Sequence, residues 1–351
     1  MTTTIDYTAL TAPTTRAAVN AFRTEMKAAG VNWGGSSIFG VLPVVFVFVL
    51  VVIFGVGSAG RWITSSLASA SDDLHLPSGL IAFLLSALLL GALGVWFWLR
   101  RNANWERWMR LSRFAAANNL VYSPSSPDPQ YPGSIFGLGS GRSALNHLRA
   151  QGTRFLDIGS YQYTTGSGKS RQTHNWGFMA FHLDRKLPHM LLDARSNNGW
   201  FGTNLPSNFD KSQVLSLEGD FNDHFTLYCP SAYERDALYV FTPDLMALLI
   251  DEASPFDVEI VDDWMFVYSS RPFNPTDPEV YRRLFRIVDT VGAKTLSQSD
   301  RYVDERVGTF AANIVAPEGR RLKKGFPVIA VVIVVIFIAV WIVPQLTEIF
   351  N

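Results

Sequence analysis

A phosphate-binding loop is the first chemistry that the sequence suggests. Gly168, Lys169 and Ser170 end the stretch GSGKS. A P-loop of the form G-x-x-x-x-G-K-[ST] uses such residues to surround phosphates with backbone N–H groups. The first glycine of that motif would fall at position 163, which is Tyr163. Apolar and aromatic residues alternate on both sides of the stretch, which is typical of two strands joined by a turn. The spacing therefore favours an exposed hairpin tip over a nucleotide site.

Signatures of nucleophilic and dinucleotide chemistry are incomplete. The nucleophile elbow G-x-S-x-G fails after Ser143 and after Ser170, where Leu145 and Gln172 stand in place of the second glycine. A dinucleotide fingerprint beginning at Gly139 follows a proline-rich loop, whereas that motif requires a preceding strand. Neither H-E-x-x-H nor C-x-x-C occurs. The sequence therefore predicts no cofactor and leaves the catalytic residues unknown.

The single cysteine and the histidines suggest structural roles. Cys229 is alone in the chain, which excludes an intramolecular disulfide and a multi-cysteine metal site. In the strand-like stretch FTLYC it shares a face with Phe225 and Leu227, so we expect a buried and inert thiol. The histidines considered for metal binding are scattered over predicted strands and strand ends, where structural histidines are common. They are His174, His182 and His189.

Acidic residues offer a possible metal site and a possible partner surface. Glu218, Asp220 and Asp223 form a cluster of oxygen ligands of the kind that hard cations prefer, although they match no calcium-loop spacing. The segment 212–270 contains twelve acids and one base, a net charge of −11. A solvated surface or a surface for a basic partner explains this charge better than a metal site does. The whole chain has zero formal net charge, so nucleic-acid binding is not predicted.

Three apolar runs predict a multi-pass α-helical membrane anchor. They cover 37–56, 79–99 and 326–343, and each can cross the roughly 30 Å hydrocarbon core. The chain is 48% apolar and 17% charged, which is low in charge for a soluble protein. Lys and Arg near the run ends predict a cytoplasmic tail at 1–36, an external loop at 57–78, a cytosolic domain at 100–324 and an external tail at 344–351. The predicted location is the plasma membrane.

An amphipathic helix is expected in the N-terminal tail. Ala18, Val19, Phe22 and Met26 share one helical face, and Gly30 is a stop signal. The helix either lies on the cytoplasmic membrane surface or packs on the domain at 100–324.

The domain at 100–324 has the pattern of an α+β fold with antiparallel hairpins. A proline-rich loop is predicted at 123–133, and a second hairpin is predicted around a turn at Asp262 and Asp263. One helix begins after Thr242 with Pro243 in its first turn, and another ends at Gly292. The predicted strands are 154–163, 174–183, 189–194 and 213–218.

One stretch, 215–269, carries a family pattern. The pattern L-E-x-x-F-x-x-x-F-x-[VL]-Y is met by Leu217, Glu218, Phe221, Phe225, Leu227 and Tyr228, and T-P-x-[LF]-M by Thr242, Pro243, Leu245 and Met246. The stretch resembles a bacterial membrane-protein family of uncharacterised function, whose members tend to have two spans before a cytosolic domain. The third apolar run departs from that arrangement. The resemblance implies membrane anchorage and an α+β domain, and it implies no activity.

Two functional hypotheses follow. In the first, the chain is an integral membrane protein in contact with the lipid bilayer, and its domain is an interaction or scaffold module. Its partner is a protein on the acidic 212–270 face or a second copy of the chain. In the second, the domain is a membrane-tethered enzyme or ligand-binding domain. It then uses the acidic cluster to hold a metal, or the turn at Gly168, Lys169 and Ser170 to hold a ligand.

Overall fold

The structure is a computed structural model of the chain. It describes residues 4–31, 33, 78–150, 152, 154–199, 203–308, 313–325 and 338. The chain divides into two compact units. One unit comprises Met1–Ala12 with Leu111–Asn351, and the other is Pro13–Arg110.

In the unit Pro13–Arg110, helix α2 (Arg16–Ala28) packs on helix α4 (Ser78–Ala117). Thr15 caps α2, because its side chain accepts a hydrogen bond from the Ala18 N–H. Phe22 of α2 is buried against Trp105 and Met109 of α4. The apolar face predicted for the tail helix is therefore buried against α4. This is the packing alternative and not the membrane-surface one.

The multi-pass anchor predicted from the apolar runs is contradicted. In the part of the chain that the structure describes, no helix is both long enough and apolar enough to cross a membrane. The run 79–99 is the first half of α4, which continues without a break into a stretch rich in arginine and tryptophan. The runs 37–56 and 326–343 lie outside the described residues, Ile338 excepted. The predicted plasma-membrane location and orientation were inferred from these runs, so they are contradicted together with the anchor.

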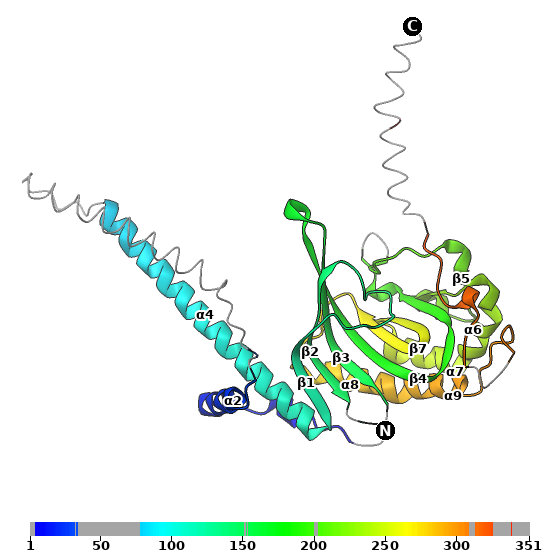
Figure 1. Cartoon of the computed structure of the whole chain (residues 1–351), viewed down its shortest axis with the longest axis horizontal. Helices are drawn as coiled ribbons and strands as arrows, with labels where there is room; N and C mark the ends of the chain where they lie inside the picture. The colour runs from blue at the N-terminus through cyan, green and yellow to red at the C-terminus, as the bar shows by residue number, and fades with distance from the viewer. Residues whose placement is uncertain are drawn as a thin grey trace, which may run out of the picture. The chain divides into compact units, whose positions relative to one another are not determined.

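The unit that holds most of the chain is built on one antiparallel sheet (Figure 1). Its order is β1-β2-β3-β4-β6-β5, and β7 also pairs with β4. β3 and β7 pair with overlapping parts of β4, so they lie along its opposite edges. The strands are β1 (Leu120–Pro127), β2 (Ser140–Ala150), β3 (Leu156–Thr165), β4 (Gln172–Ala194), β5 (Val214–Leu215), β6 (Phe225–Tyr228) and β7 (Asp257–Ser269).

Helices and short turns connect and cover these strands. Helices α7, α8 and α9 run along one side of the sheet (Figure 1). The α-helices of this unit are α1 (Thr8–Thr11), α5 (Phe221–His224), α6 (Glu234–Val240), α7 (Pro243–Leu248), α8 (Pro278–Ile287) and α9 (Ala293–Ser299), in addition to the end of α4. Leu249–Ala253 and Val288–Gly292 form π-helical turns, and 3₁₀ turns cover Gly168–Ser170, Arg195–Asn197, Lys211–Gln213, Ser231–Tyr233 and Pro317–Gly319.

Strand β4 is buried on both faces. Its residues Trp176 and Phe178 belong to a hydrophobic cluster with Tyr161 and Phe266. On the helix-covered face, a Cβ at Gly292 would lie 2.8 Å from the Phe181 ring, so the glycine allows the helices to approach closely. Burial of each such aromatic side chain contributes roughly 1.5–3 kcal/mol, so this strand is the centre of the core.

The α+β class and the hairpin around residues 166–171 are confirmed, but several element predictions are wrong. The two strands predicted at 174–183 and 189–194 form the single strand β4, and β1 takes the first part of the predicted loop. Asp262 and Asp263 do not form a turn. They lie inside β7, where Asp262 has a φ of +54° beside an irregularity in the pairing with β4. Gly292 does not end the helical segment, because α9 follows it.

Candidate functional site

The N-terminal segment, residues 4–12, is held against the end of α4. The Asp6 N–H donates to Asn118 Oδ1 over 2.8 Å, and Asn118 Nδ2 donates to the Asp6 carbonyl over 2.9 Å. The ring of Tyr7 stacks on Phe114 at 5.9 Å between centroids, and Leu10 is buried. This segment is therefore part of the folded surface.

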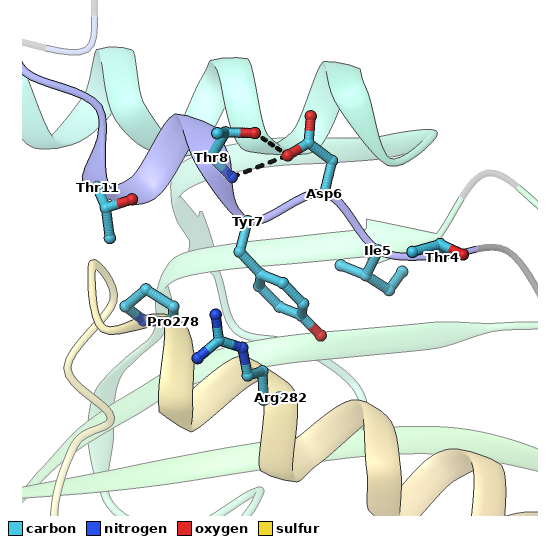
Figure 2. A pocket seen from close by; sticks show the side chains of 8 residues that line it. All are labelled: Thr4, Ile5, Asp6, Tyr7, Thr8, Thr11, Pro278 and Arg282. Atoms are coloured by element: carbon cyan, nitrogen blue, oxygen red, sulfur yellow. Dashed lines mark hydrogen bonds between the residues drawn. The ribbon is translucent and has the colours of Figure 1, made fainter.

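An open cleft lies between this segment and α8 (Figure 2). Pro278 occupies the first turn of α8, and Arg282 follows one turn later on the same helix face. The Arg282 guanidinium lies 5.1 Å from the centre of the Tyr7 ring, within the range of a cation–π contact. The cleft has a volume of about 470 Å³. Its lining residues are Thr4, Ile5, Asp6, Tyr7, Thr8, Thr11, Pro278 and Arg282.

The cleft combines apolar surface, hydroxyl groups and charge. Burial raises the pKa of the Tyr7 hydroxyl, with smaller and opposing contributions from nearby charges such as Arg282. Hydrogen bonds from the side chain and the backbone of Thr8 lower the pKa of Asp6. Arg282 also pairs with Glu279. The lining holds no histidine or cysteine, so the arrangement is suited to binding more than to nucleophilic chemistry.

The residues GKS occupy the tip of a β-hairpin. Gly168–Ser170 forms an exposed 3₁₀ turn between β3 and β4, which are antiparallel. Tyr163, at the position of the missing first glycine, pairs with His174 across that hairpin. No helix begins at Lys169, so the backbone N–H arrangement of a P-loop does not form.

The acidic cluster lies at the surface around α5. Glu218, Asp220 and Asp223 are all exposed, and Asp220 makes no side-chain cap to the helix that follows it. Within the described ranges, no three histidine, cysteine, aspartate or glutamate side chains are grouped to hold a metal ion. Cys229 is buried as expected, and burial, with the charges of Glu234 and Asp236, raises its pKa to about 12.

Much of the charge in the segment 212–270 is compensated within the fold. Two of its acids, Asp257 and Glu259, are buried in β7. Four more pair with bases that follow the segment in the sequence, so its surface is less acidic than the count suggests. These pairs are Asp236 with Arg306, Asp244 with Lys294, Glu252 with Arg286, and Asp262 with Arg321.

Two buried hydrogen-bond networks were missed by the sequence analysis. In one, Glu259 of β7 accepts a hydrogen bond from His189 of β4 over 2.7 Å. In the other, Asp157 of β3 bonds His147 of β2, whose other ring nitrogen bonds Ser126 of β1. No short motif marks either set, since their members come from different strands. Alternation of apolar and polar residues gives no signal either, because β4 and β7 are buried on both faces around His189 and Glu259.

Comparisons with known proteins are sparse. No protein-family model matches the chain, and no curated protein matches its sequence. The family resemblance of 215–269 therefore stays a prediction. Among solved structures, the chain is similar to the mycobacterial trehalose monomycolate transport factor A, TtfA, at 12% identity and a TM-score of 0.32. The match covers 54% of this chain and 89% of that one, and a TM-score this low does not establish a shared fold.

Proposed function

We propose that the chain is a protein-interaction module that receives a segment of a partner protein in the cleft between the N-terminal segment and α8. The observation that carries this proposal is the placement of the Arg282 guanidinium over Tyr7, beside the apolar surface of Ile5 and Pro278. Tyrosine and arginine next to each other are typical of the residues that contribute most to protein interfaces.

The shape of the cleft favours a protein partner over a small ligand. A volume of about 470 Å³ is within the range of ligand sites, but the cleft is open to solvent. A small molecule would keep much of its surface in water there. When a side chain of a partner protein enters the cleft, the surrounding partner surface covers the opening and excludes that water.

The chemistry of the cleft favours an acidic side chain beside an aliphatic one. The pairing of Arg282 with Glu279 uses Nη1, and a guanidinium carries five N–H donors in a planar fork. A carboxylate can therefore bind the same group, with an aliphatic side chain against Ile5 and Pro278.

The segment 212–270 supports a basic partner less well, because the downstream bases already pair with four of its acids.

Selection of random twelve-residue peptides on the intact chain tests this proposal. We expect enrichment of sequences with Asp or Glu next to Leu, Ile or Val. Arg282→Glu should weaken the selected peptides at least tenfold in fluorescence anisotropy, about 1.4 kcal/mol. Arg301→Glu, an exposed residue outside the cleft, makes the same charge change and should have no effect. Equal binding to the Arg282→Glu and unsubstituted chains, or no enrichment, contradicts the proposal.

A further inference from the structure

Three polar side chains from three neighbouring strands form a hydrogen-bonded line on one face of the sheet. Ser126 lies on β1, His147 on β2 and Asp157 on β3. Ser126 Oγ is 2.8 Å from His147 Nε2, and His147 Nδ1 is 2.9 Å from Asp157 Oδ1. These are the groups, the order and the separations of a serine nucleophile, its base and the carboxylate that orients the base.

A bulge in β2 places His147 on that face. Leu145 pairs with Ser160 and Leu148 pairs with Ile158, so β2 has one extra residue between the two pairs. Side chains alternate between the faces of a strand, and one extra residue exchanges the faces from that point. Without it, His147 would point to the opposite face of the sheet from Ala144, which pairs with Ser126 of β1.

The surroundings of His147 hold it close to β3. A Cβ at Gly159 would lie 2.4 Å from the His147 Cβ and 2.9 Å from its Cα, so only glycine allows this approach. Asp157 is fully buried and is held on its second oxygen by the Tyr131 hydroxyl at 2.5 Å and by Arg149 Nε at 3.0 Å. The carboxylate is therefore fixed in position before any substrate binds.

The hydrogen bonds also select the tautomer of His147. An ionised carboxylate only accepts hydrogen bonds, so the ring proton is on Nδ1 and the lone pair of Nε2 faces the Ser126 hydroxyl. His147 is 1% exposed, while Ser126 is half-buried. The base is thus sealed from water, and the serine that it contacts is only partly buried.

We propose that Ser126 is a nucleophile toward carboxylic esters, with His147 as its base and Asp157 as a positioning residue. Ser126 Oγ forms a bond to the acyl carbon, the ester C–O bond breaks, and the serine proton passes through His147 Nε2 to the leaving alcohol. Water then attacks the acyl-serine by the same proton route, which releases the carboxylic acid and restores the serine. This activity is independent of the cleft on α8.

A fluorophosphonate reagent tests the proposal on the full chain. Attack forms an Oγ–P bond and breaks the P–F bond, and the proton leaves with fluoride. Peptide mass spectrometry should place the adduct on Ser126, at least 100-fold ahead of Ser123 and Ser125 on the same strand. Because this comparison is made within the unsubstituted chain, misfolding cannot explain a negative result. Absence of selective labelling at Ser126 overturns the proposal.

Variants then separate activation from simple exposure. Ser126→Ala should abolish the adduct, and Ser123→Ala should retain it although Ser123 Oγ lies 3.3 Å from Ser126 Oγ. His147→Gln should slow labelling at least 100-fold, which is within the range for loss of a general base. Its far-UV circular dichroism should match that of the unsubstituted chain. Labelling of a folded His147→Gln chain at the full rate would show that the histidine does not activate the serine.

Discussion

Replacing Glu259 with glutamine is a sharp test of the buried network that joins β4, β7 and the segment near Leu322. Glu259 is fully buried and accepts from His189 Nε2 at 2.7 Å, from the Ser134 N–H at 2.8 Å and from the Tyr268 hydroxyl at 2.7 Å. Burial raises the pKa of Glu259, but these hydrogen bonds and the histidine outweigh burial and hold the pKa below its ordinary value. At pH 7 the group is therefore a carboxylate.

The protonation of His189 decides what glutamine can replace. The Leu322 N–H donates to His189 Nδ1 over 3.1 Å, so Nδ1 keeps its lone pair and the ring proton is on Nε2, facing Glu259. If the glutamine oxygen faces His189, the Ser134 N–H loses its acceptor. If the oxygen faces Ser134 and Tyr268, the glutamine amide N–H points at the N–H of His189 Nε2, and neither finds an acceptor there. Either orientation leaves one buried donor unpaired, which costs about 1–3 kcal/mol.

Hydrogen exchange of the β4 and β7 amides at pH 7 measures the loss of stability in the sheet that contains Glu259 and His189. A loss of about 2 kcal/mol should accelerate exchange through global opening roughly 30-fold. Glu305→Gln is a matched control, because the Glu305 side chain is 77% exposed and its pair with Arg235 is long, at 3.5 Å. It should leave the same amides unchanged. Exchange within threefold of the unsubstituted chain in Glu259→Gln would refute the assignment of three donors and of the His189 tautomer.

Two further substitutions address other buried groups. Burial raises the pKa of Asp257 to about 7, so the folded chain keeps this proton while the unfolded chain loses it near 3.8. The free energy of unfolding should therefore fall as pH rises from about 4 to about 7, by up to about 4 kcal/mol, and level off above that. Asp257→Asn should remove most of that slope in urea denaturation series, and an unchanged slope would contradict the raised pKa. Gly159→Ala should lower Tm by several degrees in thermal unfolding, because its methyl group would meet the Cβ and Cα of His147, at a cost of about 1–3 kcal/mol. An unchanged Tm would show that β2 and β3 are not this close.

Local signals predicted much of the secondary structure. Alternating apolar residues on both sides of GSGKS identified the β3–β4 hairpin, because burial of one strand face repeats every two residues. Thr242 followed by Pro243 marked the start of α7 through preferences that act within one turn. Cys229 was placed in the core by the face that it shares with its strand neighbours.

The same local signals failed where distant contacts decided the conformation. Asp262 and Asp263 form a typical turn sequence, yet pairing with β4 keeps them inside β7. The apolar run 79–99 predicted a membrane span, whereas no helix in the described part of the chain, α4 included, is long and apolar enough to be one. The charge of 212–270 predicted an acidic surface, and bases that follow it in the sequence now compensate part of that charge.

The sequence by itself determined the α+β class, the hairpin that carries Lys169 and the start of α7 at Pro243, because each depends on residues within a few positions of one another. Only the tertiary structure decided which polar groups meet. Ser134 and Glu259 are 125 positions apart, and His147 shares a face with Ser126 only because a bulge in β2 lies between Ala144 and His147. The cleft likewise joins Tyr7 to Arg282. Strand register and bulges place such groups to within an ångström, and no local preference of a residue encodes that placement.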